Sequence, residues 1–146
     1  MTFKIWAIDF IGPFPIPTKR TGARYIITTV EYVTKWGEEE PFDTCSSEIT
    51  TKFIDDNIIT KFGFPITLIS DQGTHFINKT IKTLTDQFQI AHRWTTAYHP
   101  LSNGAIKEFN TTLTKGLTKI CNTDKDDWDE KIPTYYGQVY QQVRQT

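Results

Sequence analysis

The sequence lacks the features that mark secreted, membrane and zinc-finger proteins. No window approaches the roughly 18 apolar residues of a membrane span, and residues 1–11 are interrupted by charges where an export signal would be apolar. Cys45 and Cys121 form no CxxC pair, and His75 and His92 complete no zinc pattern with them. These absences predict a soluble, intracellular protein whose thiols stay reduced.

Charge of one sign is also scarce, since the net charge is only −1. That balance argues against a strong nucleic-acid binder. The distribution is uneven, however: residues 1–36 and 71–122 carry an excess of Lys and Arg, whereas residues 37–70 carry an excess of Asp and Glu. A basic face is therefore possible after folding, although ordinary surface charge is the simpler interpretation.

What the chain does have is enough apolar residues for one packed domain, with 38% hydrophobic and 14% aromatic residues in 146. Runs rich in β-branched and aromatic residues predict strands, and apolar residues at helical spacing predict helices. The expected strands are 3–11, 25–32, 38–42, 66–70 and 90–94. A first helix is expected to begin at Ser46 or Ser47 and to end at Gly63, and further helices are expected at 78–88, 104–122 and 128–143, with a loop at 97–103.

This order predicts an α/β fold: three successive strands, then strands alternating with helices, form a mixed five-stranded sheet flanked by helices. It is the order of ribonuclease H-like proteins. The run of Glu in 38–42 suits an edge strand. Trp6, Trp36 and Trp94 are expected in the core rather than in a binding site.

Two carboxylates stand where this fold can bring them together. Asp9 lies near the end of the first strand, and Asp71 directly follows the strand at 66–70. If the two strands are neighbours, both carboxylates emerge at one end of the sheet, and a Mg²⁺ ion would relieve their repulsion. Taken singly, Asp71 before Gly73 is also explained by turn chemistry, and Asp9 by a strand end.

Several motifs then resemble one family. They are WAIDFIGPFP (6–15), KFGFP (61–65), ISDQGTHF (69–76), YHPLSNG (98–104) and DWDEKIP (127–133). Together they are similar to the integrase catalytic core of retroviruses and gypsy-type LTR retrotransposons. The resemblance implies a ribonuclease H-like fold, two Mg²⁺ or Mn²⁺ ions, and a transesterification that joins element DNA ends to target DNA. It covers 1–146 as one core domain, without the family's N-terminal zinc-binding or C-terminal DNA-binding module.

In that family the catalytic metal ligands are two Asp and a Glu, which implies Asp9, Asp71 and a third carboxylate separated from Asp71 by 35 residues. Position 107, however, is Lys107, and the nearest carboxylate is its neighbour Glu108. One helical residue turns the side chain by about 100° and moves it about 1.5 Å. If the stripe Ile106, Phe109, Leu113, Leu117 and Ile120 faces the core, Lys107 and Glu108 lie on opposite flanks of it.

We therefore expect Lys107 to face the metals and Glu108 to point away, which predicts weak metal binding and little strand transfer. The alternative is a slip of the first helical turn beside Asn103 and Gly104, which would bring Glu108 inward. A second departure lies at 134–145, where Gly and Gln replace the family's apolar helix.

The resemblance also implies partners. Tyr98, His99, Asn103 and Lys107 correspond to the loop that contacts DNA beside the cleaved phosphate, although His99 and Lys107 also suit a turn and a solvated helix position. Because family cores often dimerise, a homodimer is possible, and nuclear rather than cytoplasmic action is implied only by the resemblance. Two other functions stay open: a non-catalytic domain that binds nucleic acid or protein, and a ribonuclease H-like nuclease, which the YHPLSNG motif disfavours.

Overall fold

A computed structural model describes residues 3–94, 100–121 and 123–132, with only the backbone described at 100–103. The strands are β1 (Ile5–Ile11), β2 (Tyr25–Glu31), β3 (Gly37–Phe42), β4 (Thr67–Ser70) and β5 (Ala91–Trp94); the helices are α1 (Ser47–Ile54), the π-helical η1 (Asp55–Ile59), α2 (Thr60–Phe62), α3 (Lys79–Gln87) and α4 (Pro100–Ile120). In this part of the chain the strands form one sheet in the order β3-β2-β1-β4-β5.

The sheet is mixed, as the sequence predicts. β1 pairs antiparallel with β2 and parallel with β4, and β5 extends the parallel part. The strands at 3–11 and 66–70 are therefore neighbours, which confirms the adjacency on which the carboxylate argument depends. The ribonuclease H-like α/β fold is confirmed with it.

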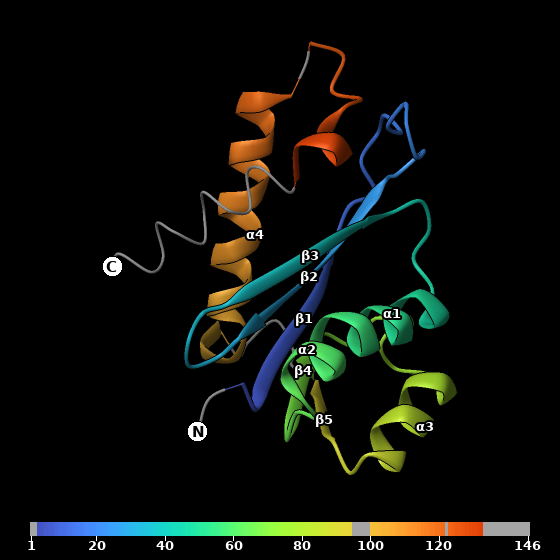
Figure 1. The fold of residues 1–146 in the computed structure, drawn as a ribbon, viewed down its shortest axis with the longest axis vertical. Coiled ribbons are helices and arrows are strands. Elements are labelled where there is room, and N and C mark those ends of the chain that lie inside the picture. Colours follow the sequence, from blue (N-terminus) through green and yellow to red (C-terminus); the bar gives the residue numbers. More distant parts are fainter. Residues whose placement is uncertain (1–2, 95–99, 122, 133–146) are drawn as a thin grey trace.

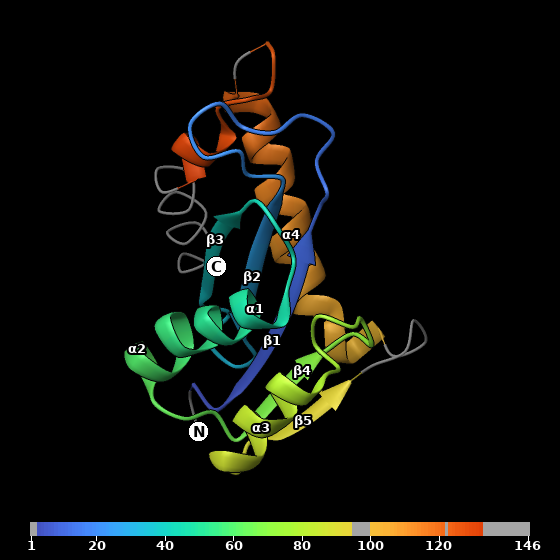
Figure 2. The ribbon, with the colours of Figure 1, turned by 90° about the vertical axis from the view of Figure 1, so that its right-hand side faces the viewer.

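Alternation along β1 divides the core into two layers. Trp6 and Ile8 pack with Phe53 of α1 and other apolar residues on one face, whereas Ala7 packs with Leu113 of α4 on the other. Figures 1 and 2 show the same arrangement, with α1, α2 and α3 on one side of the sheet and α4 on the other. The long helix α4 thus lies across β1 and β2, where it can reach the end of β1 that carries Asp9.

Side-chain caps explain where two helices begin. The hydroxyl of Ser46 accepts the backbone N–H of Ile49 at 3.3 Å, and the amide oxygen of Asn78 accepts that of Ile81 at 3.0 Å. Both starts agree with the helices expected from the sequence.

Several expectations were wrong in detail. α4 begins at Pro100, so residues 100–103, expected in a loop, are helical; Pro fits the first turn because its missing N–H needs no partner there. Trp94 is 53% exposed, because β5 is an edge strand with one neighbour. Ile120, expected in the apolar stripe, is 40% exposed at the last position of α4.

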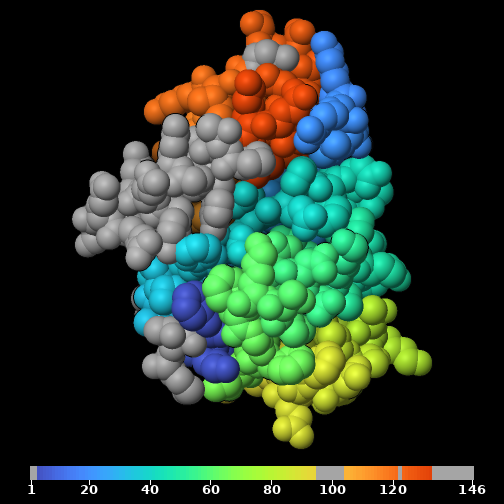
Figure 3. Space-filling model, viewed as in Figure 1, coloured from blue at the N-terminus to red at the C-terminus, as the bar shows by residue number. Residues whose placement is uncertain are grey.

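The last helix can be compared with the sequence only in part. Residues 128–132 are helical, and the rest of the expected 128–143 helix lies outside the described residues. Residues 123–132 gather with the end of α4 and the segment after β1 at one end of the molecule (Figure 3). Among the residues described, none of the helices has both the length and the apolarity needed to cross a membrane.

Candidate active site

The parallel pairing of β1 and β4 places the two aspartates at the same edge of the sheet. Ile5 is opposite Thr67 and Ala7 is opposite Ile69, so continuing this register sets Asp9 level with Asp71. The two charges interact, since Asp71 contributes to raising the pKa of Asp9. The fold thus places Asp9 and Asp71 at the same edge of the sheet, as the sequence predicts.

Asp9 is held by hydrogen bonds to both carboxylate oxygens. The backbone N–H of Phe10 donates to Oδ1 at 2.9 Å, and Nδ2 of Asn110 donates to Oδ2 at 3.0 Å. Burial nonetheless raises the pKa of Asp9 to about 6; Asp71 adds to the rise, while the two hydrogen bonds and the charge of Lys107 oppose it. Because burial disfavours the ionised form of Asp9, a nearby positive charge stabilises that form.

Asp71 is exposed and shaped by a tight turn. Its Oδ1 accepts the backbone N–H of Gly73 at 2.7 Å, and a Cβ on Gly73 would lie only 2.7 Å from the ring of His75. Asp71 therefore stabilises a tight turn and also lies level with Asp9, so the two interpretations of this residue are compatible. The charge of Asp71 also reaches His75 and Cys45, since it acts to raise the pKa of each; burial, the larger cause, lowers the pKa of His75 and raises that of Cys45.

Lys107, rather than Glu108, completes the group of charges. The charges that act on Asp9 are those of Asp71 and Lys107. Both Lys107 and Glu108 are exposed on α4, and the residues on either side of them, Ile106 and Phe109, are buried as the apolar stripe requires. Because α4 begins seven positions earlier, at Pro100, the two residues lie well inside the helix, and a slip of its first turn does not move them.

Asp71 and Lys107 are therefore the two charged groups that act on Asp9, and Glu108 is not among them. Within residues 3–94, 100–121 and 123–132, no three His, Cys, Asp or Glu side chains lie close enough to hold a metal ion. Two carboxylates and an ammonium carry a net charge of −1, whereas three carboxylates would carry −3. The arrangement described does not fit a pair of divalent ions.

Three of the four expected DNA contacts cannot be judged from side chains. Tyr98 and His99 lie outside the described residues, and Asn103 is described only in its backbone, within α4. Lys107 is exposed at the same edge as the aspartates.

Sequence reasoning missed Asn110, which the structure places in the site. Its amide donates to Asp9, and its oxygen accepts the hydroxyl of the fully buried Thr28 at 2.6 Å. Thr28 is also the partner of Asp9 in the β1–β2 pairing. The available signal was position: Asn110 follows Lys107 by three residues, which puts both on one side of a helix.

The site thus combines a ribonuclease H-like sheet, one aspartate near the end of β1 and one just after β4, and a long helix packed across the sheet. The integrase core domain family model matches residues 1–100. The chain therefore belongs to the integrase core domain family. The matched residues include Asp9 and Asp71 and end before Lys107 and Glu108.

Two similar proteins are polyproteins of retroelements. The chain is 27% identical over 128 residues to the Gag-Pol polyprotein of avian reticuloendotheliosis virus and 31% identical over 122 residues to the retrovirus-related Pol polyprotein from transposon 412 of Drosophila melanogaster. The alignments cover 88% and 84% of this chain but only 11% and 10% of those polyproteins. This chain thus corresponds to a small part of much longer relatives.

A solved structure shares the fold. A chain from the simian T-cell lymphotropic virus intasome in complex with PP2A regulatory subunit B56 gamma superposes with a TM-score of 0.69 at 18% identity, over 82% of this chain and 41% of that chain.

Proposed function

We propose that this chain is a retroelement integrase core that binds DNA, with element ends and target DNA as its partners, and in which Lys107 impairs metal-dependent polynucleotidyl transfer. Family membership and the aspartate pair support the first part. The observation that carries the second part is the charge of Lys107 acting on Asp9.

The impairment follows from charge and from ligand number. An ammonium beside Asp9 and Asp71 repels a divalent cation and supplies no oxygen ligand, so each ion would lose both attraction and coordination. Glu108 does not compensate, because metal ligation tolerates displacements of only a few tenths of an ångström. If metal does bind, Asp9 and Asp71 are the residues that would hold it, and it would activate an attacking oxygen for displacement at phosphorus.

The test compares the unaltered chain with Lys107→Glu, with Glu108→Lys, and with Lys115→Glu as a control. Lys115 is an exposed lysine on the same helix, so the control makes the same change of charge away from the site. We expect Mn²⁺ affinity, measured by calorimetry, to rise about tenfold or more in Lys107→Glu and to stay unchanged in the control.

Strand transfer with Mg²⁺ supplies the second measurement. We expect little product from the unaltered chain and from Glu108→Lys, and a gain in Lys107→Glu. Robust activity of the unaltered chain that disappears in Glu108→Lys would overturn the proposal, because Glu108 would then be the third ligand.

A second candidate is a non-catalytic domain that binds nucleic acid or a protein. The same position of Lys107 favours it, because an ammonium at this edge can pair with a phosphate without any metal. DNA binding that persists in Lys107→Glu while strand transfer stays absent in every variant would favour this candidate. On the family resemblance we also propose a homodimer and nuclear action, and the mass of the chain in solution tests the first.

A further inference from the structure

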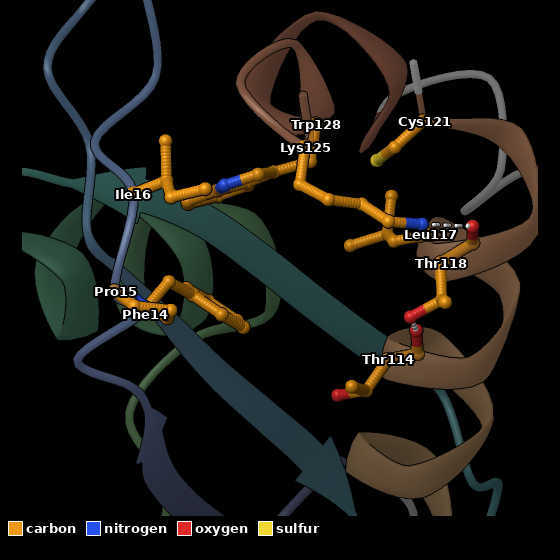
Figure 4. A pocket seen from close by; sticks show the side chains of 9 residues that line it. All are labelled: Phe14, Pro15, Ile16, Thr114, Leu117, Thr118, Cys121, Lys125 and Trp128. Carbon is orange, nitrogen blue, oxygen red and sulfur yellow. Dashed lines mark hydrogen bonds between the residues drawn. The ribbon is translucent and has the colours of Figure 1, made fainter. Parts of the chain in front are cut away.

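A cavity of about 230 Å³ lies at the opposite end of α4 from the aspartates. The last turns of α4, the segment after β1 and the residues that follow α4 enclose it (Figure 4); its lining is Phe14, Pro15, Ile16, Thr114, Leu117, Thr118, Cys121, Lys125 and Trp128. Lys107 and Cys121 are 14 residues apart, which corresponds to about 21 Å along a helix. The cavity is therefore distinct from the candidate active site.

The walls are mainly apolar, but they contain a buried donor. Trp128 is 5% exposed, and within the part of the chain that the structure describes its indole nitrogen Nε1 has no hydrogen-bond partner. The ring is held in place against Phe14, with the ring centroids 4.9 Å apart. A buried N–H without an acceptor is unfavourable, so an incoming acceptor would be stabilised there.

Ile16 lines the cavity on the side of this donor. In Figure 4 the indole lies across one end of the cavity with its nitrogen on the side of Ile16. Ile16 is 45% exposed, on a loop segment between Pro15 and Pro17, so its side chain can turn outward to admit an acceptor. On the other side, the ammonium of Lys125 already donates to the carbonyl of Thr118 at 3.0 Å.

Size and polarity together indicate the kind of occupant. The volume is below the roughly 300 Å³ at which pockets for drug-sized ligands begin, so it suits a group about as large as one bulky side chain. The buried indole N–H suits one acceptor, which a peptide main chain supplies next to each side chain. A nucleic acid would find few polar contacts in such walls.

We propose that this cavity anchors one aromatic or bulky aliphatic side chain of a partner protein, whose neighbouring main-chain carbonyl accepts the indole N–H of Trp128. The anchor resembles an interface hot spot, in which a buried tryptophan and an apolar pocket contribute most of the binding energy. The proposal does not depend on the aspartates or on Lys107.

The test uses blocked amino acids as the smallest probes of this chemistry. N-acetyl-phenylalanine methylamide is titrated into the ¹⁵N-labelled chain, and the indole N–H resonance of Trp128 is followed by NMR and assigned with Trp128→Phe. We expect a saturable shift, with an affinity about tenfold or more above that of N-acetyl-glycine methylamide, because only the first probe fills the cavity.

Three variants separate the parts of the proposal. Trp128→Phe keeps an aromatic ring on Phe14 but removes the donor, and should weaken the phenylalanine probe about threefold to tenfold. Ile16→Ala should strengthen it by opening the path to Nε1, and Thr114→Phe should abolish it by filling the cavity. Thr111→Ala, exposed on α4 and outside the cavity, is the control.

Either of two results overturns the proposal. One is the absence of a saturable shift at Trp128, with the other indole resonances confirming that the chain is folded. The other is toluene binding as tightly as the phenylalanine probe, which would mean that the cavity accepts any apolar molecule and that the main-chain carbonyl adds nothing.

Discussion

A row of hydrogen bonds links Asp9 on β1 to Thr28 on β2 through Asn110 on α4. The hydroxyl of Thr28 donates to Asn110, and Asn110 donates to Asp9. Every member is at least partly buried, so each donor depends on its acceptor and no water replaces a lost partner freely. A residue that is not a carboxylate therefore fixes the carboxylate of the site.

Replacing Asn110 should show this dependence. Asn110→Ala leaves the buried hydroxyl of Thr28 and one oxygen of Asp9 without partners, so we expect a loss of about 1–3 kcal/mol in the free energy of unfolding, measured with urea. Asn110→Asp keeps the size and the acceptor for Thr28 but sets a carboxylate against Asp9. Its loss should grow as the pH rises and both groups ionise.

Thr111→Ala, exposed on the next position of the helix, controls for the change in helix propensity. Equal losses in Asn110→Ala and Thr111→Ala would contradict the role of the row.

How much of the site follows from the sequence depends on whether a feature is local. The pairing of β1 with β4 and the meeting of Asp9 with Asp71 follow from strand periodicity and fold order, and both could be predicted. The hydrogen bond from Asn110 to Asp9 joins residues 101 positions apart and depends on the rotation of α4, so no local sequence pattern predicts it. The orientation of Lys107 lies between these cases, since the apolar stripe fixes it once α4 is known to cover the sheet.

At the scale of single elements, β3 shows what a local pattern misses. The run of Glu in it was expected because an edge strand tolerates charge, and β3 is indeed an edge strand. Yet Glu38 is 7% exposed and pairs with Lys61 at 3.0 Å, while Oε2 of Glu39 is buried and has no hydrogen-bond partner among the residues described. Edge position leaves one side of a strand open, but helices still cover its faces.

Glu39 should therefore make the domain less stable as the pH rises. Burial raises the pKa of Glu39 from 4.5 to about 9, and the charge of Glu38 adds to the rise against the opposing charge of Lys61. In the folded chain the carboxyl keeps its proton at neutral pH, whereas in the unfolded chain it ionises above 4.5. Stability from this group is thus full below pH 4.5 and is lost progressively towards pH 9.

Glu39→Gln removes this loss, so we expect a gain of roughly 1–3 kcal/mol at pH 7 that shrinks towards pH 4.5, measured by urea unfolding across the pH range. Glu130→Gln, at an exposed position, should change little at any pH. A gain that is the same at both pH values would mean that Glu39 is already ionised in the folded chain.

At the scale of the whole molecule, the chain has a near-neutral balance of charge, with basic and acidic stretches in different parts of the fold. Such a molecule attracts DNA only where its cations gather, so the edge that carries Lys107 is decisive. In an integrase core with three carboxylates, metal ions would link the protein to phosphate. Here the ammonium of Lys107 can make that link itself, and the requirement for metal in binding should be lost.

DNA binding should therefore be indifferent to chelation in this chain and sensitive to it in the variant with three carboxylates. Fluorescence anisotropy with a labelled duplex should give the same Kd with Mg²⁺ and with EDTA for the unaltered chain, and binding should weaken as salt rises. In Lys107→Glu, EDTA should weaken binding, because the carboxylates then repel phosphate unless metal is present. Lys115→Glu should weaken binding equally with and without metal, since it changes charge without adding a ligand. If EDTA weakened binding of the unaltered chain as much as that of Lys107→Glu, Lys107 would not be the group that stands in for the metal.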